Sequence, residues 1–278
     1  MKNRTWYRVT RHALLGLGIA AVTLAGCNDN GTGGASGRGS MVLIMHDAPV
    51  DDFKEVWVTV ESVTMIGADA DSNASGEVVL SESVRMDLLT LDSTAQIIAA
   101  ADVAAGSYSK IRLQVSDPEF VRNDDSVFMD EDIHLVADGH VDINTQGDVF
   151  VVGEQVTVVS LDLDVNNSIQ INQTGNGRYI LRPQIFVDND MADEEGIVIR
   201  GATVTSINLS TGRLTLSTSQ NVAAVDLMVS TTSETDILSV GGLPVGLVAL
   251  SVGSTVDVVG TIDVDTGVVT ASEIRVML

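Results

Sequence analysis

Hydrophobic and polar residues alternate along three segments between residues 41 and 188. The segments are EVWVTVESV at 55–63, SKIRLQV at 109–115 and TVVSLDLDV at 157–165. Successive side chains of a β-strand point to opposite faces, so this period of two predicts strands with one buried face. Clusters of turn-forming residues separate the strands, at 68–76, 122–126 and 172–177.

One segment predicts a helix instead. It is the Ala-rich STAQIIAAADVAAG at 93–106, in which Ser93 is a favourable N-cap and Gly106 a favourable end. Because strands precede and follow it, residues 41–188 predict an antiparallel β-sandwich with one minor helix.

The chain changes character after an acidic stretch at 189–196, which we interpret as a domain linker. Residues 197–278 contain no Phe, Trp or Tyr. Two hairpins with Ser-Thr-Gly and Asp-Thr-Gly turns, together with AAVDLMVS at 223–230, predict five or six strands. A small β-barrel would close the exposed edges of so small a sheet.

The first 26 residues have the plan of a bacterial signal peptide. Four basic residues precede an apolar run that is shorter than the roughly 20 residues a membrane-spanning helix needs. The single cysteine of the chain, Cys27, follows this run. Residues 27–40 contain no aliphatic residue larger than alanine, which predicts a flexible tether.

The motif LAGC at residues 24–27 resembles the lipobox of bacterial lipoproteins. The resemblance implies that Cys27 is linked to diacylglycerol and becomes the N-terminus after cleavage. Asn28 follows the cysteine, at the position where an aspartate would alter sorting. The resemblance therefore implies an outer-membrane lipoprotein. It does not decide between the periplasmic and the surface face of that membrane. The alternative is an ordinary signal peptide followed by an incidental cysteine.

Charge excludes one class of partner. Removal of residues 1–26 takes four of the 15 basic residues and none of the 38 acidic ones, which leaves a formal charge of 11 − 38 = −27. Such a body repels phosphate backbones, so nucleic acid is excluded. With one cysteine in the chain, disulfides within it and cysteine-based zinc sites are excluded as well.

Five blocks between residues 41 and 187 resemble, in order, a family of bacterial lipoprotein domains of unknown function. The blocks are MVLIMHDAPVDDFKEVWVTVESVTM, VRMDLLTL, VAAGSYSKIRLQV, VVSLDLDV and GRYILRPQI. The family opens with Thr-Asp-Ala-Pro, where this chain has His46-Asp47-Ala48-Pro49. The resemblance implies a prealbumin-like or Ig-like sandwich, related in fold to carbohydrate-binding modules, and supplies no catalytic residues. Residues 197–278 are similar to a second family of unknown function, a small β-barrel.

Two of these blocks have a structural interpretation. Gly106-Ser107-Tyr108 predicts a tight turn into a strand and a tyrosine corner, in which the hydroxyl bonds backbone near the start of the strand. Asp47 and Pro49 predict a capped, stiffened turn. We prefer these structural roles to ligand binding.

The sequence predicts a protein that is not an enzyme and has no resident cofactor. After residue 27 the histidines are His46, His134 and His140, and no Gly-x-Ser-x-Gly motif is present. His134 and His140 flank LVADG, a predicted hairpin turn across which they would face each other. Without a third ligand, surface histidines are favoured over a metal site.

Two acidic groups are weak candidates for Ca²⁺. Asp69, Asp71 and Asn73 alternate in GADADSNASGE, but the glycine and glutamate of an EF-hand loop are missing, which favours a solvated hairpin loop. Asp162 and Asp164 share one strand face, about 7 Å apart by strand rise. A cation could bridge them if that face were dry.

Trp57 is the leading candidate for ligand binding. Alternation places it on one strand face with Thr59 and Glu61. An exposed tryptophan is a platform for a sugar ring, whereas a covering loop or helix would bury it. We therefore expect a binding module for a neutral glycan or an envelope protein. The alternative is a structural or assembly component with no small ligand.

Overall fold

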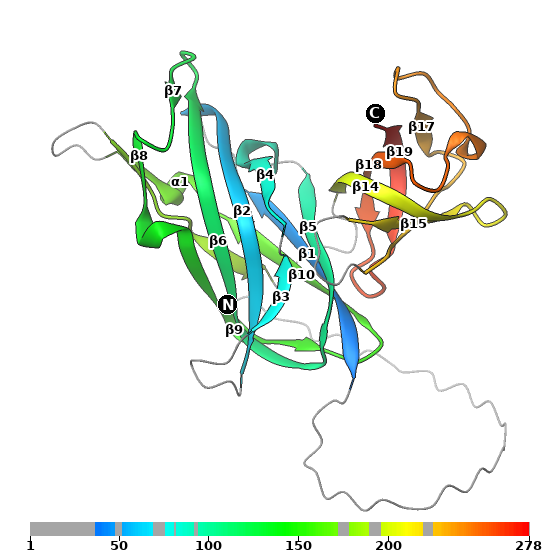
Figure 1. Cartoon of the computed structure of the whole chain (residues 1–278), viewed down its shortest axis with the longest axis horizontal. Coiled ribbons are helices and arrows are strands. Elements are labelled where there is room, and N and C mark those ends of the chain that lie inside the picture. Colours follow the sequence, from blue (N-terminus) through cyan, green and yellow to red (C-terminus); the bar gives the residue numbers. More distant parts are fainter. Residues whose placement is uncertain are drawn as a thin grey trace, which may run out of the picture. The chain divides into compact units, whose positions relative to one another are not determined.

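The computed structural model describes residues 37–47, 52–68, 76–80, 82–91, 94–171, 178–188, 196–218 and 225–277, all within a compact unit spanning Gly34–Leu278. The predicted all-β class is confirmed (Figure 1). Helical structure in the described residues comprises α1 (Val165–Ser168) and the 3₁₀ turns η1 (Leu88–Leu91), η2 (Val136–Gly139) and η3 (Leu247–Ala249). None of these described helices is long and apolar enough to cross a membrane.

A six-stranded sheet is built on two long strands, β2 (Phe53–Gly67) and β6 (Gly106–Arg122), which pair antiparallel along nearly their whole length. Beside β2 lie β3 (Glu77–Leu80) and β4 (Val84–Asp87). Beside β6 lie β7 (Val127–Phe128) and β9 (His140–Val151). The predicted turn at 122–126 joins β6 to β7, with the Arg122 N–H donating to the Ser126 carbonyl at 2.9 Å.

A second sheet faces the first. It is one end of a ten-stranded sheet, and its strands run in the order β13 (Ile185–Asp188), β10 (Val156–Leu163), β1 (Arg38–Asp47) and β5 (Ala95–Ala104) before the sheet continues into the C-terminal strands. β1 is parallel to β10 and antiparallel to β5. A separate small sheet contains β11 (Ile169–Ile171), β12 (Tyr179–Leu181) and β8 (Ile133–Leu135).

A hydrophobic core, the first core, lies between the two large sheets. It contains the apolar positions of all three alternating segments, including Val56, Val58, Val60, Ile111, Leu113, Val115, Val159, Leu161 and Leu163. The predicted strand faces are therefore confirmed. Four aromatic rings, those of Phe53, Phe120, Phe128 and Tyr179, pack in tilted and edge-on pairs with centroids 4.7 to 5.8 Å apart.

The predicted tyrosine corner is present at the start of β6. The Tyr108 hydroxyl donates a hydrogen bond to the Ala104 carbonyl oxygen at 2.7 Å. This bond ties the end of β5 to the beginning of β6 and so holds the crossover from one sheet to the other. The side chain of Asp47 and residue Pro49, predicted to form a turn, lie outside the described residues.

The predicted helix over 93–106 is wrong, because residues Ala95–Ala104 form strand β5. Both faces of this strand are covered. Ile98, Ala99 and Ala101 belong to the first core, whereas Ile97 and Ala100 belong to a second hydrophobic core on the opposite face. A strand buried on both faces loses the alternation that marks half-buried strands.

The C-terminal region contains five strands whose pairings form a ring. They are β14 (Gly196–Asn208), β15 (Arg213–Ser217), β16 (Leu227–Ser230), β19 (Val269–Val276) and β18 (Thr255–Ile262), and β18 returns to β14. A sixth strand, β17 (Asp236–Leu238), adds to β19. β14 therefore pairs with both β15 and β18. Glycines with φ of +67° stand at both predicted hairpin turns, Gly212 and Gly267.

The second core joins this ring to the sandwich. It contains Val42, Ile44, Ile97 and Ala100 from β1 and β5 together with apolar residues from the strands of the ring. β14 also pairs in parallel with β5, with Ile197 opposite Ala95. The predicted linker residues 189–195 lie outside the described residues, so the predicted domain boundaries remain a prediction.

Cleavage of the chain between residues 189 and 195 should leave its two parts associated, because the second core draws residues from both. The measurement is size-exclusion chromatography after cleavage at a protease site inserted in this segment, with the uncleaved protein as control. The fragments should co-elute in buffer and separate in denaturant. Separate elution of two folded fragments in buffer would contradict this expectation.

Candidate functional site

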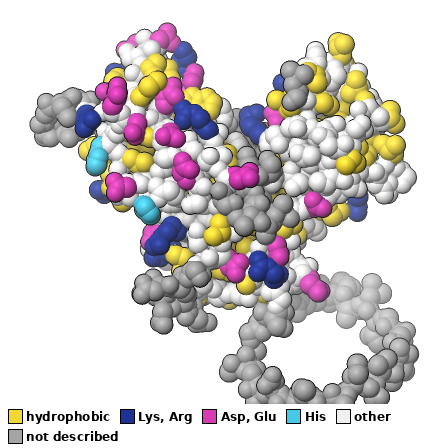
Figure 2. Space-filling view, in the orientation of Figure 1, with side chains coloured by type: hydrophobic (Ala, Val, Ile, Leu, Met, Phe, Trp, Pro, Cys, Tyr) yellow, Lys and Arg dark blue, Asp and Glu magenta, His cyan; other side chains and the backbone are white. Residues whose placement is uncertain are grey.

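The outer face of the six-stranded sheet carries a group of polar and aromatic side chains that we call the Trp57 face. It consists of Glu55, Trp57, Glu61, Arg85, Ser116 and Glu119. Strand register brings them together, since Trp57 pairs with Glu119 on β6, and Thr59 pairs with both Arg85 on β4 and Ser116 on β6. Figure 2 shows acidic and basic side chains interspersed over this side of the molecule.

Trp57 is half-buried and lies against a cation. Its indole N–H donates to Glu55 Oε2 at 2.7 Å, and the Arg85 guanidinium carbon lies 5.5 Å from the centre of its ring. Arg85 in turn donates to Glu119 Oε2 at 2.6 Å and to the Asp117 carbonyl oxygen at 3.1 Å. The aromatic ring is thus held on a rigid sheet with hydrogen-bonding groups on either side.

The two residues predicted to accompany Trp57 differ in accessibility. Thr59 is buried, with 7% of its surface exposed, so its hydroxyl is hardly available to a ligand. Glu61 is partly exposed and accepts a hydrogen bond from the Ser116 hydroxyl. The alternation therefore predicted the shared face correctly but not the burial of Thr59 between its neighbours on β4 and β6.

Asp87, at the end of β4, positions the strand segment that carries Trp57. Its Oδ1 accepts hydrogen bonds from the Val56 N–H at 2.9 Å and the Leu89 N–H at 3.2 Å. Burial raises the pKa of this carboxyl above its ordinary value, although both hydrogen bonds act in the opposite direction. Asp87 belongs to the VRMDLLTL block and has a structural role there.

A polar hollow of about 340 Å³ adjoins the Trp57 face. It is lined by Gln114, Val115, Ser116, Asp117, Asp130, Ile133, His134, Leu135 and Asp138. Ser116 belongs to both regions, and its hydroxyl donates a hydrogen bond to Glu61. Asp117, which lines the hollow, accepts a hydrogen bond from Arg85 through its carbonyl oxygen. The two features therefore form one continuous surface.

Left-handed backbone shapes the rim of this hollow. Asp117, Ala137 and Asp138 have φ of 46°, 55° and 51°, which is uncommon for residues with a Cβ. The Gln114 amide donates to the Asp138 carbonyl at 2.8 Å and holds the η2 turn against β6. At Gly139 a Cβ atom would lie 1.9 Å from the Val115 carbonyl oxygen, so this close approach requires glycine.

Sequence reasoning missed Arg85, Glu119 and the hollow. Arg85 alternates with the buried residues Val84 and Met86, which is a local signal that it points away from the core, but no local pattern shows that it meets Trp57 on the neighbouring strand. The residues at 130–138 carry no periodic pattern, and their place beside β6 depends on long-range strand pairing.

The predicted arrangement of His134 and His140 is wrong. His134 lies on β8, which pairs in parallel with β12, whereas His140 begins β9, which pairs with β6. The intervening residues are thus not a hairpin turn between paired strands. His140 Nδ1 lies 3.2 Å from the Ala137 carbonyl oxygen, and His134 lines the polar hollow.

The carboxylates of Asp162 and Asp164 have separate partners. Asp162 Oδ1 lies 3.5 Å from His46 Nδ1, whereas Asp164 caps α1 and accepts the Asn167 N–H at 3.0 Å. Asp69, Asp71 and Asn73, like Cys27, lie outside the described residues. Within the described part of the chain no three His, Cys, Asp or Glu side chains are grouped as metal ligands would be.

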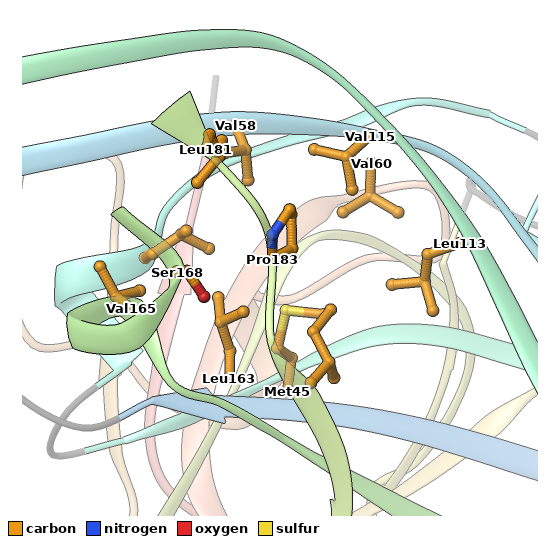
Figure 3. A pocket seen from close by; sticks show the side chains of 12 residues that line it. Met45, Val58, Val60, Leu113, Val115, Leu163, Val165, Ser168, Leu181 and Pro183 are labelled. Carbon is orange, nitrogen blue, oxygen red and sulfur yellow. The ribbon is translucent and has the colours of Figure 1, made fainter. Parts of the chain in front are cut away.

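Figure 3 shows an apolar crevice between the two large sheets, near α1. Ten of its twelve lining residues are Val, Leu, Ile or Met, and the other two are Ser168 and Pro183. The Ser168 hydroxyl donates to the Asp164 carbonyl and accepts the Gln184 N–H, so it is occupied within the fold. A cavity of about 20 Å³ has room for roughly one water molecule. The crevice is part of the packed core.

Residues 38–183 match the model of a family described as "Domain of unknown function (DUF4382)". The match covers more than half of the 278 residues. The chain belongs to the DUF4382 family. Neither the curated proteins nor the solved structures contain a match to it. The Trp57 face, the hollow and the crevice all lie within the DUF4382 region, apart from Ile185 at the edge of the crevice, whereas the strand ring follows it.

Farther along the outer face of the DUF4382 sheet, Asp142 on β9 lies between two cations. Arg112 donates to both of its carboxylate oxygens, at 2.6 and 2.9 Å, and Lys110 donates at 3.1 Å. The hydrogen bonds from Arg112, opposed in part by burial and aided by Lys110, lower the pKa of Asp142 to about 2. This group ties β9 to β6 beside the polar hollow.

Asp142→Asn should lower the stability of the protein at neutral pH and weaken its acid dependence. The folded pKa of about 2 lies below the ordinary value of 3.8, so the ionised carboxylate stabilises the fold above about pH 4, and this stabilisation is lost as the pH falls toward 2. Because the pair is partly exposed, the effect at pH 7 should be at most about 1 kcal/mol.

Urea unfolding at about pH 7, 4 and 2.5 would measure this effect, because these three pH values lie above, near and below the ordinary pKa of a carboxyl group. Glu82→Gln, at an exposed residue, is the matched control and should leave the pH profile unchanged. An Asp142→Asn protein whose stability declines with acid as steeply as the original would contradict the assigned role of the Arg112 pair.

Proposed function

We propose that this DUF4382 protein is a lipid-anchored, non-catalytic binding module of the bacterial cell envelope that takes a neutral glycan on its Trp57 face. The anchor is Cys27, followed by the tether, and the site lies on the sandwich. The proposal joins the lipobox resemblance of the sequence to the side-chain arrangement on β2, β4 and β6.

The observation that carries the proposal is a partly exposed tryptophan held on a rigid sheet among hydrogen-bonding groups. A sugar has an apolar C–H face, which packs on an aromatic ring, and hydroxyls, which need donors and acceptors around it. Glu55 and Glu119 supply acceptors next to the ring. Strands position side chains more exactly than loops do, which lowers the ordering cost of binding.

The adjoining hollow extends the surface to more than one sugar unit. Its Asp117, Asp130 and Asp138 carboxylates accept hydrogen bonds from hydroxyl groups. The same carboxylates, on a chain with a formal charge of −23 before processing, repel a polyanionic glycan. A neutral glycan therefore fits better than an acidic one.

Arg85 must move for a sugar to stack on the ring face that it covers. Its side chain is 41% exposed and its ion pair with Glu119 is a surface pair, so displacing it costs about 1 kcal/mol. Stacking on one ring returns a comparable amount. Single-site affinity should therefore be weak, and tethering near a surface would compensate by raising the effective concentration.

A structural or assembly role in the envelope is the second candidate. The observation that favours it is a set of exposed large apolar side chains, among them Phe150 and Leu243, whose exposed fractions are 64% and 69%. Such side chains mark protein contacts when they are grouped.

Trp57→Ala should abolish binding of neutral oligosaccharides, because it removes the stacking platform. Arg85→Ala should strengthen binding a few-fold, because the covered ring face becomes free without losing the tryptophan. A neutral-glycan array identifies the ligand, and titration followed by tryptophan fluorescence measures the affinity of the original and Arg85→Ala proteins. Calorimetry measures Trp57→Ala.

The matched control is Arg112→Ala, which removes an arginine from the same sheet face away from Trp57 and should leave glycan binding unchanged. Binding that persists in Trp57→Ala would remove Trp57 from the site. Absence of binding across neutral glycans would favour the structural role.

Cys27→Ser should release the protein from the membrane, because serine cannot form the thioether to diacylglycerol. Membrane fractionation and incorporation of labelled palmitate measure this, and Cys27→Ser should show neither membrane association nor label. Asn28→Gln, which alters the neighbouring residue and keeps the thiol, is the control. Unchanged labelling of the Cys27→Ser protein would overturn the lipoprotein assignment.

A further inference from the structure

Residues 239–254, between β17 and β18, carry a group of exposed aliphatic side chains. We call this segment the strap. Val240, Leu243, Val248 and Val252 have exposed fractions of 50%, 69%, 79% and 65%. In Figure 2 hydrophobic side chains stand out on the surface in the region that Figure 1 labels β17. Apolar side chains grouped in this way mark an interaction surface.

The strap displays these side chains on a backbone fixed by hydrogen bonds. The Ser239 N–H donates to the Leu243 carbonyl at 2.9 Å, and the Val245 N–H donates to the Ile237 carbonyl at 2.8 Å. At the other end the Gly253 N–H donates to the Val204 carbonyl of β14 at 2.8 Å. These bonds fix the backbone of the strap, and its exposed apolar side chains would gain stability by being covered.

The strap is uncharged in a strongly acidic protein. No Asp, Glu, Lys or Arg occurs from Ile237 to Val256, although the chain has a formal charge of −23. Two copies of so acidic a chain repel each other over most of their surface. At the strap no like charges meet, and apolar surface is complementary to itself. A twofold pair needs this property, because the same patch supplies both sides of its interface.

The strap lies at the end of β18 that is farther from the start of the described chain. The β18–β19 turn lies against β10, since a Cβ on Gly267 would be 2.5 Å from Val156 Cγ1, and Val156 pairs with Ser40 near the start of the described chain. The strap enters β18 at the opposite end of that strand, about 23 Å away at the usual rise per residue.

We propose that the strap is the surface through which two copies of this chain associate. Leu243 and Val248 are the most exposed of its side chains and would lie at the centre of the contact. The anchor of the proposed function would favour the pair by confining copies to one plane, but the strap contact itself does not depend on glycan binding or on lipidation.

Sedimentation velocity over a range of protein concentrations tests the proposal. The protein begins at Asn28, which keeps the whole compact unit Gly34–Leu278. The original sequence should dimerise with increasing concentration, and more strongly at high salt, which screens the repulsion between acidic bodies. Leu243→Ser with Val248→Ser should raise the dimer dissociation constant at least about 10-fold, because buried apolar anchors carry most of an interface.

Val127→Ser with Met129→Ser is the matched control, because these side chains are 49% and 55% exposed on the sandwich. It should leave dimerisation unchanged, and circular dichroism confirms that both double variants fold. A protein that stays monomeric at every concentration up to about 100 μM would associate more weakly than specific complexes typically do, and this result would overturn the proposal. So would a dimer that the strap variant leaves intact. Flotation of a monomeric protein with phosphatidylcholine vesicles, lost in the strap variant, would assign the strap to a lipid surface instead.

Discussion

The fold depends on the burial of β1 and β5 on both of their faces. Met41 and Leu43 point into the first core, and Val42 and Ile44 point into the second. The hydrophobic effect acts on the whole surface of these strands, whereas in an ordinary sandwich it acts on one face of each strand. The alanines of β5 suit this position, because small side chains let the ring approach the sheet closely.

This constraint determines which large sheet face is left to the solvent. The sheet that contains β1 and β5 has the six-stranded sheet on one side and the ring on part of the other. The outer face of the six-stranded sheet remains, and it carries ion pairs such as Arg85 with Glu119 and Arg112 with Asp142. Trp57 stands among these charges, and its half-buried ring lies on the face that a ligand can reach.

The two surfaces that we assign to binding differ in chemistry and in place. The Trp57 face lies in the DUF4382 region and combines an aromatic ring with charged and polar groups. The strap lies in the ring and is aliphatic and uncharged. A hydroxylated ligand suits the first surface, since it offers hydrogen bonds. An apolar protein surface suits the second, since it offers none.

Local chemistry let the sequence predict a large part of this structure. Alternation placed Val56, Ile111 and Leu161 in the core, glycine predicted the turns at 212 and 267, and Gly106-Ser107-Tyr108 predicted the corner bond. Each of these depends on residues within a few positions of one another, through sterics and the two faces of a strand.

The tertiary structure decided what depends on distant residues. β5 was predicted as a helix because burial on its second face comes from strands that begin about a hundred residues later. His134 and His140 were predicted to face each other, but β8 pairs with β12 rather than with its neighbour β9. Arg85 meets Trp57 because β4 and β2 are in one register. Strand pairing is chosen by the packing of the whole chain, and no pattern within a segment records its partner. The sequence therefore determined the half-buried strands, the turns and the charge of this protein, and the packing of both faces of β1 and β5 decided which of its surfaces remained open to a ligand or partner.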